Sequence, residues 1–303
     1  MAKTTFSGPV RSENGYKLVS KTASTGVVHD RTVHDLGIKD TRRYYLEEYF
    51  AQLPGVNADL ASSTEATNTP VSRNFEVIGT NKTSALATFN ATSAGMTITT
   101  AGADQDQMIV APHLDTKQSA WTQTGWGTEN QVHWEASVRT ASSIADVKLW
   151  AGLKLTNDQL PETDANQAYF YFATDETNGQ VLSSYTPLYF IYSIAGADYL
   201  TNTGITVAAD TNYHLKIVID SDRKASIFVN GVQYGLATTA TTTFDGTTSV
   251  TGTTQATIDD ITQKSTALTN DINLIPYVGV ETGTGSAKAF NLHYEAISRL
   301  IYE

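Results

Sequence analysis

The six histidines are the residues of this sequence best suited to metal binding or acid–base chemistry, because the chain has no cysteine. No two of them have the i, i+4 spacing that an HExxH zinc helix requires. His133, His214 and His293 occupy polar positions in segments where polar and apolar residues alternate. If these segments are neighbouring strands, the three rings converge on one face of a sheet. We expect solvated or hydrogen-bonded histidines there rather than a metal site.

Paired carboxylates, the groups that hydrolyse glycosides, are the second chemistry to consider. Sandwich glycosidases of the laminarinase type carry a Glu-x-Asp-x-(x)-Glu run on one strand, and the sequence has none. Residues 131–139 contain only Glu135, and residues 287–296 contain only Glu295. Nucleophile-elbow and phosphate-binding motifs are also absent. The sequence therefore predicts a protein that is not an enzyme.

Acidic residues in two polar segments would suit calcium, which prefers oxygen ligands from loops. No Asp-x-Asp-x-Asp-Gly loop accompanies them. We expect no cofactor, and calcium is the one ion that these loops would fit: Asp158, Glu162, Asp164, Asp175 and Glu176.

Trp121 and Trp126 lie in a segment rich in glycine and threonine. Two interpretations stay open for them. Exposed indoles would stack on sugar rings or contact a neighbouring subunit. Alternatively, the same indoles cap the end of a hydrophobic core.

Composition limits the classes of partner. The chain has 303 residues and a net charge of −11, which disfavours nucleic-acid binding because that binding depends on Lys and Arg. No apolar run approaches the roughly 20 residues of a membrane-spanning helix. The first residues lack the apolar segment of a secretion signal. We expect no nucleic acid and no membrane among the partners.

A two-residue period begins near Asn74. Apolar residues occupy alternate positions in residues 131–139, 214–220 and 290–296. In the last segment the pattern places Phe290, Leu292, Tyr294 and Ala296 on the apolar face and Asn291, His293 and Glu295 on the polar face. One apolar and one polar face per strand indicates an antiparallel sheet with a single side in the core.

Other segments are apolar on both faces, namely residues 168–172 and 188–192, and these predict central or covered strands. Turn residues separate the strands. Ser221 to Lys224 predicts one hairpin, and Asn230-Gly231 predicts the next. Many short strands without long helices predict a mostly β protein, an antiparallel β-sandwich over residues 71–303.

The first 70 residues differ from the rest. Residues 1–40 are rich in turn signals and predict an extended N-terminal arm. Asp40 is a candidate N-cap for a short helix over residues 41–53, with Leu46, Phe50 and Leu53 on one face. The remainder of residues 41–70 predicts a linker.

Residues 213–231 resemble the hairpin of laminin-G-like and concanavalin A-like jelly rolls, in which an acidic turn and an Asn/Asp-Gly turn join successive strands. Residues 150–154, 168–170 and 275–280 are similar to the same folds. The resemblance covers residues 130–303 and implies a jelly roll.

The opening residues 4–15, together with residues 44–60, resemble the start of structural proteins from tailed phages of marine bacteria. That resemblance implies a virion component such as a capsid decoration protein, made in the host cytoplasm and placed on the capsid surface. It carries no catalytic residues. The implied partners are sister subunits, as a trimer, and the major capsid protein or another virion protein.

In this interpretation the N-terminal region binds the shell or a sister subunit. Its expected contact residues are aromatic, basic or turn-forming: Phe6, Pro9, Arg11, Tyr16, Arg42, Arg43, Tyr45, Tyr49 and Phe50. The alternatives are a tail-fibre component, or a carbohydrate-binding module that uses Trp121, Trp126 and the polar segments 156–165, 174–186 and 237–255.

Overall fold

The structure is a computed structural model in which contacts divide the chain into two units, residues 1–39 and residues 40–303. The residues that it describes are 19–21, 28–30, 42–56, 72–90, 93–113, 121, 124–156, 164–174, 182, 185–240, 251–258, 260–283 and 285–301.

The first unit contains two described strands. Strands β1 (Val19–Lys21) and β2 (Val28–Asp30) pair antiparallel as a two-stranded sheet. The rest of the predicted arm, and residues 57–70 of the predicted linker, lie outside the described residues.

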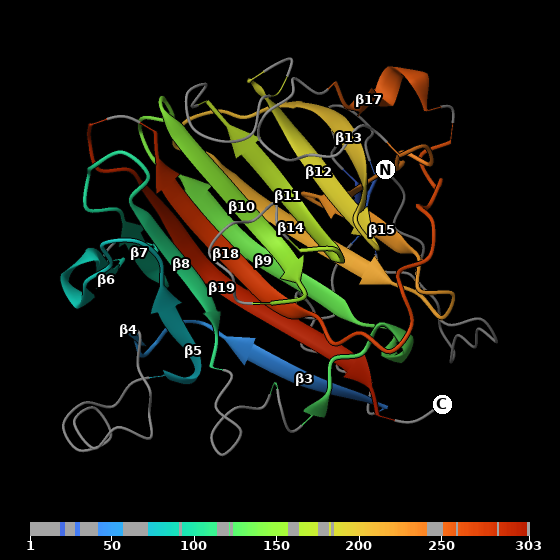
Figure 1. Ribbon diagram of the computed structural model, residues 1–303, viewed down its shortest axis with the longest axis horizontal. Helices are drawn as coiled ribbons and strands as arrows, with labels where there is room; N and C mark the ends of the chain where they lie inside the picture. Colours follow the sequence, from blue (N-terminus) through green and yellow to red (C-terminus); the bar gives the residue numbers. More distant parts are fainter. Residues whose placement is uncertain are drawn as a thin grey trace, which may run out of the picture. The chain divides into compact units, whose positions relative to one another are not determined.

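The second unit contains two large sheets (Figure 1). The first is nine-stranded, in the order β17 (Thr253–Thr254), β13 (Ala197–Thr206), β12 (Pro187–Ile194), β11 (Gln167–Ala173), β10 (Val147–Lys154), β18 (Ile275–Thr282), β8 (Gln107–Pro112), β5 (Ser72–Ile78) and β4 (Pro54–Val56). Its pairs are antiparallel except β13 with β17 and β4 with β5.

The second sheet is eight-stranded, in the order β16 (Val232–Tyr234), β15 (Ala225–Val229), β14 (Asn212–Ile219), β9 (His133–Thr140), β19 (Ala289–Leu300), β7 (Met96–Thr99) and β6 (Ala87–Phe89), with β3 (Arg43–Glu48) on β19. β7 pairs with the first part of β19 and β3 with the last part. The described helices are short 3₁₀ turns at Ser84–Leu86, Thr128–Asn130 and Gln255–Thr257. None of the helices described is long and apolar enough to cross a membrane.

The core lies between the two sheets. Trp134 and Ile217 of the eight-stranded sheet and Phe170 and Val278 of the nine-stranded sheet belong to one cluster and are at most 1% exposed. The chain passes from one sheet to the other between β3 and β4, β5 and β6, β7 and β8, β8 and β9, β9 and β10, β13 and β14, β16 and β17, and β18 and β19. Such crossings are typical of jelly rolls. The predicted antiparallel β-sandwich is confirmed.

The turn chemistry is also confirmed. Residues 220–224 connect β14 to β15, and Asn230-Gly231 connects β15 to β16. Asn230 has φ 52° and Gly231 has φ 77°, the left-handed pair that a tight hairpin needs and that Asn-Gly provides at low cost.

The predicted helix over residues 41–53 is wrong. Residues 43–48 form β3, which pairs with β19 from Leu300 to Glu295. Pairing with β19 satisfies the backbone hydrogen-bonding groups of this segment. The segment also begins with two arginines, whose positive charges would oppose the helix dipole in a first turn. Two adjacent tyrosines also favour a strand. The apolar spacing at Leu46, Phe50 and Leu53 therefore does not decide the conformation.

The predicted alternation of residues 290–296 is wrong in its second half. The pairing of β19 with β9 shifts by one residue between Leu292 and Tyr294, which is a β-bulge. Gly95 makes room for it, because a Cβ there would lie 2.5 Å from the Cα of His293. Beyond the bulge Tyr294 is half-buried on the outward side, whereas Glu295 is fully buried and bonds to Trp134.

Candidate functional site

The outward side of β14, β9 and β19 carries a continuous group of polar and aromatic side chains, which we name the polar face. It comprises Tyr49, His133, Glu135, Ser137, Arg139, His214, Lys216, Asn291, His293 and Tyr294. Cross-strand register places these side chains in rows, with His214 opposite Ser137 and Ser137 opposite Tyr294. All are exposed or half-buried except Glu135, which is 6% exposed.

Glu135 is the centre of the polar face. Its Oε1 accepts a hydrogen bond from the Tyr294 hydroxyl, and its Oε2 lies 3.8 Å from His214 Nε2. The rings of His214 and Tyr294 are stacked with centroids 6.2 Å apart, and Tyr49 stacks on Tyr294 at 5.6 Å. Tyr49 is 56% exposed, so this cluster ends in a ring that is open to solvent.

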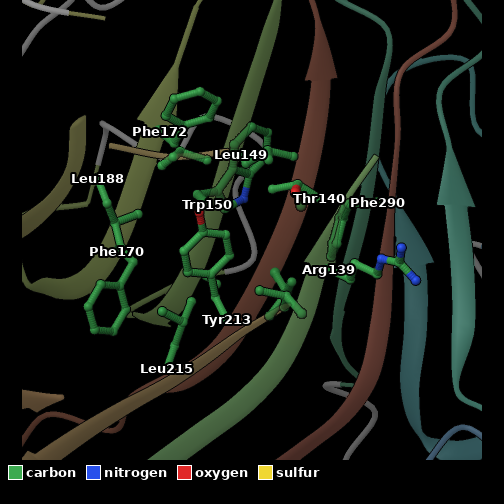
Figure 2. A pocket seen from close by; sticks show the side chains of 15 residues that line it. Arg139, Thr140, Leu149, Trp150, Phe170, Phe172, Leu188, Tyr213, Leu215 and Phe290 are labelled. Atoms are coloured by element: carbon green, nitrogen blue, oxygen red, sulfur yellow. The ribbon is translucent and has the colours of Figure 1, made fainter. Parts of the chain in front are cut away.

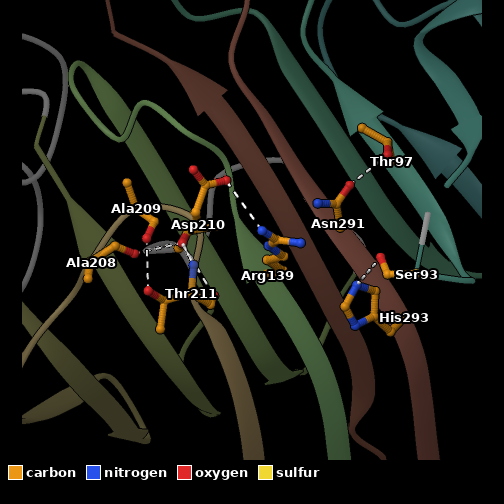
Figure 3. A network of polar contacts seen from close by, with 10 residues as sticks. Ser93, Thr97, Arg139, Ala208, Ala209, Asp210, Thr211, Asn291 and His293 are labelled. Atoms are coloured by element: carbon orange, nitrogen blue, oxygen red, sulfur yellow. Dashed lines mark hydrogen bonds and ion pairs between the residues drawn. The ribbon is translucent and has the colours of Figure 1, made fainter. Parts of the chain in front are cut away.

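Arg139 lies at one end of the polar face (Figure 3). Its Nη2 is 3.6 Å from Asp210 Oδ1, and the next strand places Asn291 directly opposite it. Asn291 Oδ1 accepts a hydrogen bond of 2.6 Å from Thr97, and Ser93 lies 3.2 Å from His293 Nε2. Burial, and then the charge of Arg139, lower the pKa of His293.

The condition that the sequence set for the three histidines is met, because β14, β9 and β19 are neighbours, but the described rings share the polar face without converging. His133, His214 and His293 are spread along that face. Over the described part of the chain, no three His, Asp or Glu side chains gather closely enough to hold a metal ion.

The outward side of the nine-stranded sheet, which we name the covered face, has a different character. Trp150, Tyr169, Tyr171, Tyr189 and Tyr277 are each at most 2% exposed. The indole of Trp150 stacks near the Tyr277 ring, with centroids 6.4 Å apart. All seven residues of β11 are buried, which confirms that the apolar run at residues 168–172 is a covered strand.

Charged side chains on the covered face are paired. Lys148 Nζ lies 2.8 Å from Glu281 Oε1, and both side chains are almost fully buried. Gln107 donates a hydrogen bond of 2.5 Å to the other oxygen of Glu281. Lys154 lies 3.8 Å from Asp164 and 4.4 Å from the centre of the Tyr277 ring.

A small cavity lies between the sheets (Figure 2). Its volume is about 50 Å³, and Ala151, Phe170, Leu215 and Phe290 are among the side chains that line it. Arg139 lines it as well, but Figure 2 shows its guanidinium group turned away. An apolar cavity that binds benzene has a volume of roughly 150 Å³. The cavity is therefore a packing gap and not a ligand site of that size.

The predicted contact residues of the N-terminal region are distributed between surface and core. Phe50 is 1% exposed and packs on Phe75. Arg43 donates hydrogen bonds to the backbone and side chain of Ser298. Tyr45 is half-buried, Arg42 and Tyr49 are exposed, and four further predicted residues lie outside the described residues: Phe6, Pro9, Arg11 and Tyr16.

Trp121 and Trp126 are 3% and 0% exposed, and their ring centroids are 4.9 Å apart. They pack with Phe75 in the core. This placement corrects the predicted glycan or subunit contact, because a partner cannot reach a buried indole. The second interpretation, that the indoles cap the core, fits the structure.

Among the loop acids that would suit calcium, Asp164 is the one that is described. Its Oδ2 accepts hydrogen bonds from the backbone of Leu155 and Thr156, and its Oδ1 accepts one from the Thr156 hydroxyl. These bonds hold the loop after β10. The other four lie outside the described residues.

Sequence reasoning names Tyr49 as a contact residue but misses Tyr294, the other aromatic residue of the polar face. Tyr294 was assigned inward because a bulge cannot be read from alternation alone. Tyr49 was assigned to a helix. The signal available was Gly95, a glycine beside the strand that pairs with β19, since glycine often marks close approach of two backbones.

Comparisons with known proteins give a consistent but coarse result. No protein-family model and no curated protein matches the chain. Among solved structures, a protein of unknown function from Shewanella oneidensis is similar with a TM-score of 0.47 at 9% identity, over 86% of this chain and 87% of the other. A family 7 alginate lyase in complex with substrate gives a TM-score of 0.42 at 12% identity, over 76% and 95% of the two chains. A carbohydrate-binding module from Bacillus subtilis gives 0.34 at 10% identity, over 72% and 94%. These likenesses assign no activity to this chain.

Proposed function

We propose that this protein is a non-catalytic glycan-binding β-sandwich and that the polar face is its binding surface. One observation carries the proposal. Three neighbouring strands place hydrogen-bonding side chains together on one side of a rigid sheet, and the accessible ring of Tyr49, the residue after β3, stacks on them at Tyr294. Sugars present hydroxyl groups and apolar ring faces, and this combination of side chains fits both.

The polar face has the elements of such a site. Tyr49 supplies an open ring that is held by stacking on Tyr294. Around it, His214 offers a ring nitrogen at a fixed position on a rigid strand, and the buried Glu135 holds both Tyr294 and His214 in place. Groups held by strands lose little conformational freedom on binding, which favours affinity.

A glycan array with matched variants tests the proposal. Tyr49→Ala removes the exposed ring, and the expected result is a loss of binding of roughly tenfold, as for removal of an aromatic contact. Phe89→Ala is the control, because Phe89 is 57% exposed on β6, outside the polar face. An array without signal, or an equal loss in both variants, would contradict the proposal.

The non-catalytic part has its own test. The protein is incubated with each polysaccharide that it binds, and product length is followed by chromatography. We expect no shortening of the polymer. Cleavage that His214→Ala abolishes would show that the Glu135 cluster is catalytic.

A second candidate function is that of a virion structural protein of a tailed phage, decorating or cementing the capsid through the N-terminal region. The resemblance of residues 4–15 and 44–60 supports it, and so does an exposed apolar group at the start of β3. Tyr44 is 38% exposed and Ile301 is 47% exposed. Ile301 donates a backbone hydrogen bond to Arg42, so both residues lie at the same end of the β3–β19 pair.

Imaging of particles with the labelled full-length protein tests this candidate. Label on the head would support capsid decoration, label on the tail would support a fibre component, and unlabelled particles would contradict both. The two candidate functions are compatible, since a protein on a particle surface can also bind a glycan.

A further inference from the structure

Arg139 is in an unusual place for a cation of this acidic protein. It lies on the central strand β9 with Asn212 opposite on one side and Asn291 opposite on the other. Its side chain is 34% exposed, and its nearest described anion, Asp210, is 62% exposed and 3.6 Å away. An ion pair this open contributes little to stability. Asp210 therefore holds Arg139 only loosely.

Arg139 and Asn291 both present hydrogen-bond donors on this part of the polar face. The Nε of Arg139 is buried and has no hydrogen-bond partner among the described residues. Asn291 uses its oxygen to accept from Thr97, and Figure 3 shows its amide nitrogen on the side of Arg139. An arginine offers five N–H groups and no acceptor, and the Asn291 nitrogen offers two more. Converging donors favour a ligand group that only accepts.

His293 reports on the charge of Arg139. Burial and the positive charge of Arg139 hold the pKa of His293 below its usual value. An anion bound to Arg139 would offset that positive charge and raise the pKa of His293. The titratable neighbours of Arg139 on this part of the polar face are His293 and Asp210.

We infer that Arg139 and Asn291 bind an oxyanion substituent, a carboxylate or sulfate, on a saccharide that lies along the polar face. The inference rests on the proposed glycan-binding function and names its ligand class, an acidic saccharide. The planar guanidinium group forms two parallel hydrogen bonds with such an oxyanion. Asn291 donates a third bond, and Asp210 turns aside into solvent.

Affinity electrophoresis of the full-length protein tests the inference with three polymers: polygalacturonate, dextran sulfate and unsubstituted dextran. We expect retardation by one acidic polymer at moderate salt and none by dextran. Preference between the first two polymers identifies the oxyanion as carboxylate or sulfate. Arg139→Gln is expected to weaken binding about tenfold, the effect of losing one charge-assisted bond pair.

Lys264→Gln is the matched control, because it removes one positive charge from an exposed position outside the polar face, where Lys264 pairs with Asp220. Its affinity should stay within about twofold of the original protein, as expected for an exposed charge. Equal losses in the two variants would show general electrostatic attraction and overturn the inference. Arg139→Lys should recover only part of the affinity, because an ammonium group lacks the planar fork.

A further measurement separates this inference from the proposed function. If neutral glycans bind and Arg139→Gln leaves that binding unchanged, with no preference for acidic polymers, the inference fails and the glycan-binding function stands. If no polymer or array glycan binds, both fail. NMR titration of His293 provides a readout of structure: Arg139→Gln should raise its pKa, and so should bound polygalacturonate or dextran sulfate.

Discussion

The two outward sides of this sandwich carry similar types of residue in opposite environments, one buried and the other open to solvent. Both carry tyrosines, lysines and glutamates, but the covered face buries them, whereas the polar face leaves all of them except Glu135 half-buried or exposed. Lys148 and Glu281 are 2.8 Å apart with almost no exposure, whereas Arg139 and Asp210 are 3.6 Å apart with 34% and 62% exposure. A buried pair must be satisfied internally, while an open pair can exchange its partner for a ligand. The difference indicates which face stabilises the fold and which face is available for recognition.

The comparison between the two faces would fail if the ion pair of the covered face did not stabilise the fold. Lys148→Ala leaves Glu281 buried and without its cation, and the expected cost is about 3–5 kcal/mol of unfolding free energy. Arg139→Ala on the polar face should cost less than about 1 kcal/mol, because Asp210 stays in water. Urea denaturation of both variants measures the difference. Similar costs would remove the distinction between the faces.

Glu295 lies behind the polar face, inside the core, and its side chain belongs to neither face. Burial raises its pKa to about 8, although Trp134 donates a hydrogen bond to Oε1. The folded protein therefore retains a proton that the unfolded chain releases near the ordinary value of 4.5. By linkage, this group lowers stability as pH rises from about 4.5 to about 8.

Glu295→Gln removes that ionisation and keeps an acceptor for Trp134. The variant should match the original protein near pH 4 and exceed it above pH 8 by an amount on the order of a few kcal/mol. Denaturation at several pH values checks the expectation. A constant difference across the range would show that the carboxyl group is solvated, and that the bulge does not bury it.

The sequence pattern predicts some features of the two faces and not others. Strict alternation at residues 131–139 and 214–220 was sufficient to assign their polar sides, and the runs at 168–172 and 188–192 correctly indicated covered strands. These assignments depend on the local pattern of polar and apolar residues, which can be read from the sequence alone. The Asn230-Gly231 turn was readable for the same reason.

The features that the sequence does not predict depend on contacts between distant segments. The bulge at His293 lies where β19 pairs with β9 on one side and approaches Gly95 closely on the other. Residues 43–48 are a strand because β19 offers them a partner some 250 positions away, as Arg43 with Ser298 shows at a separation of 255. Two tryptophans in a turn-like segment are buried because Phe75 packs against Trp121. The period of apolar residues in the sequence does not identify any of these partners.

A smaller effect comes from glycine on the covered face. A Cβ at Gly279 would lie 2.6 Å from two carbons of the Trp150 indole, so Gly279→Ala must displace that ring. The expected cost is about 1–3 kcal/mol. Ser137→Ala on the polar face is the control and should change stability by less than about 0.5 kcal/mol. Thermal melts of the two variants test whether the covered face is packed as tightly as the core.

The smallest expected effect has the opposite sign and comes from the space between the faces. Ala151→Val extends a side chain into the cavity of about 50 Å³, and a β-branched residue suits a strand. We expect a gain of about 1 kcal/mol in unfolding free energy. Ala173→Val makes the same change on the covered face, where Ala173 is 0% exposed, and should cost about 1–3 kcal/mol by overpacking. Calorimetry of both variants compares the inner side of β10 with the outer side of β11, and a loss in the first variant would mean that the gap cannot accept a larger side chain without moving a sheet.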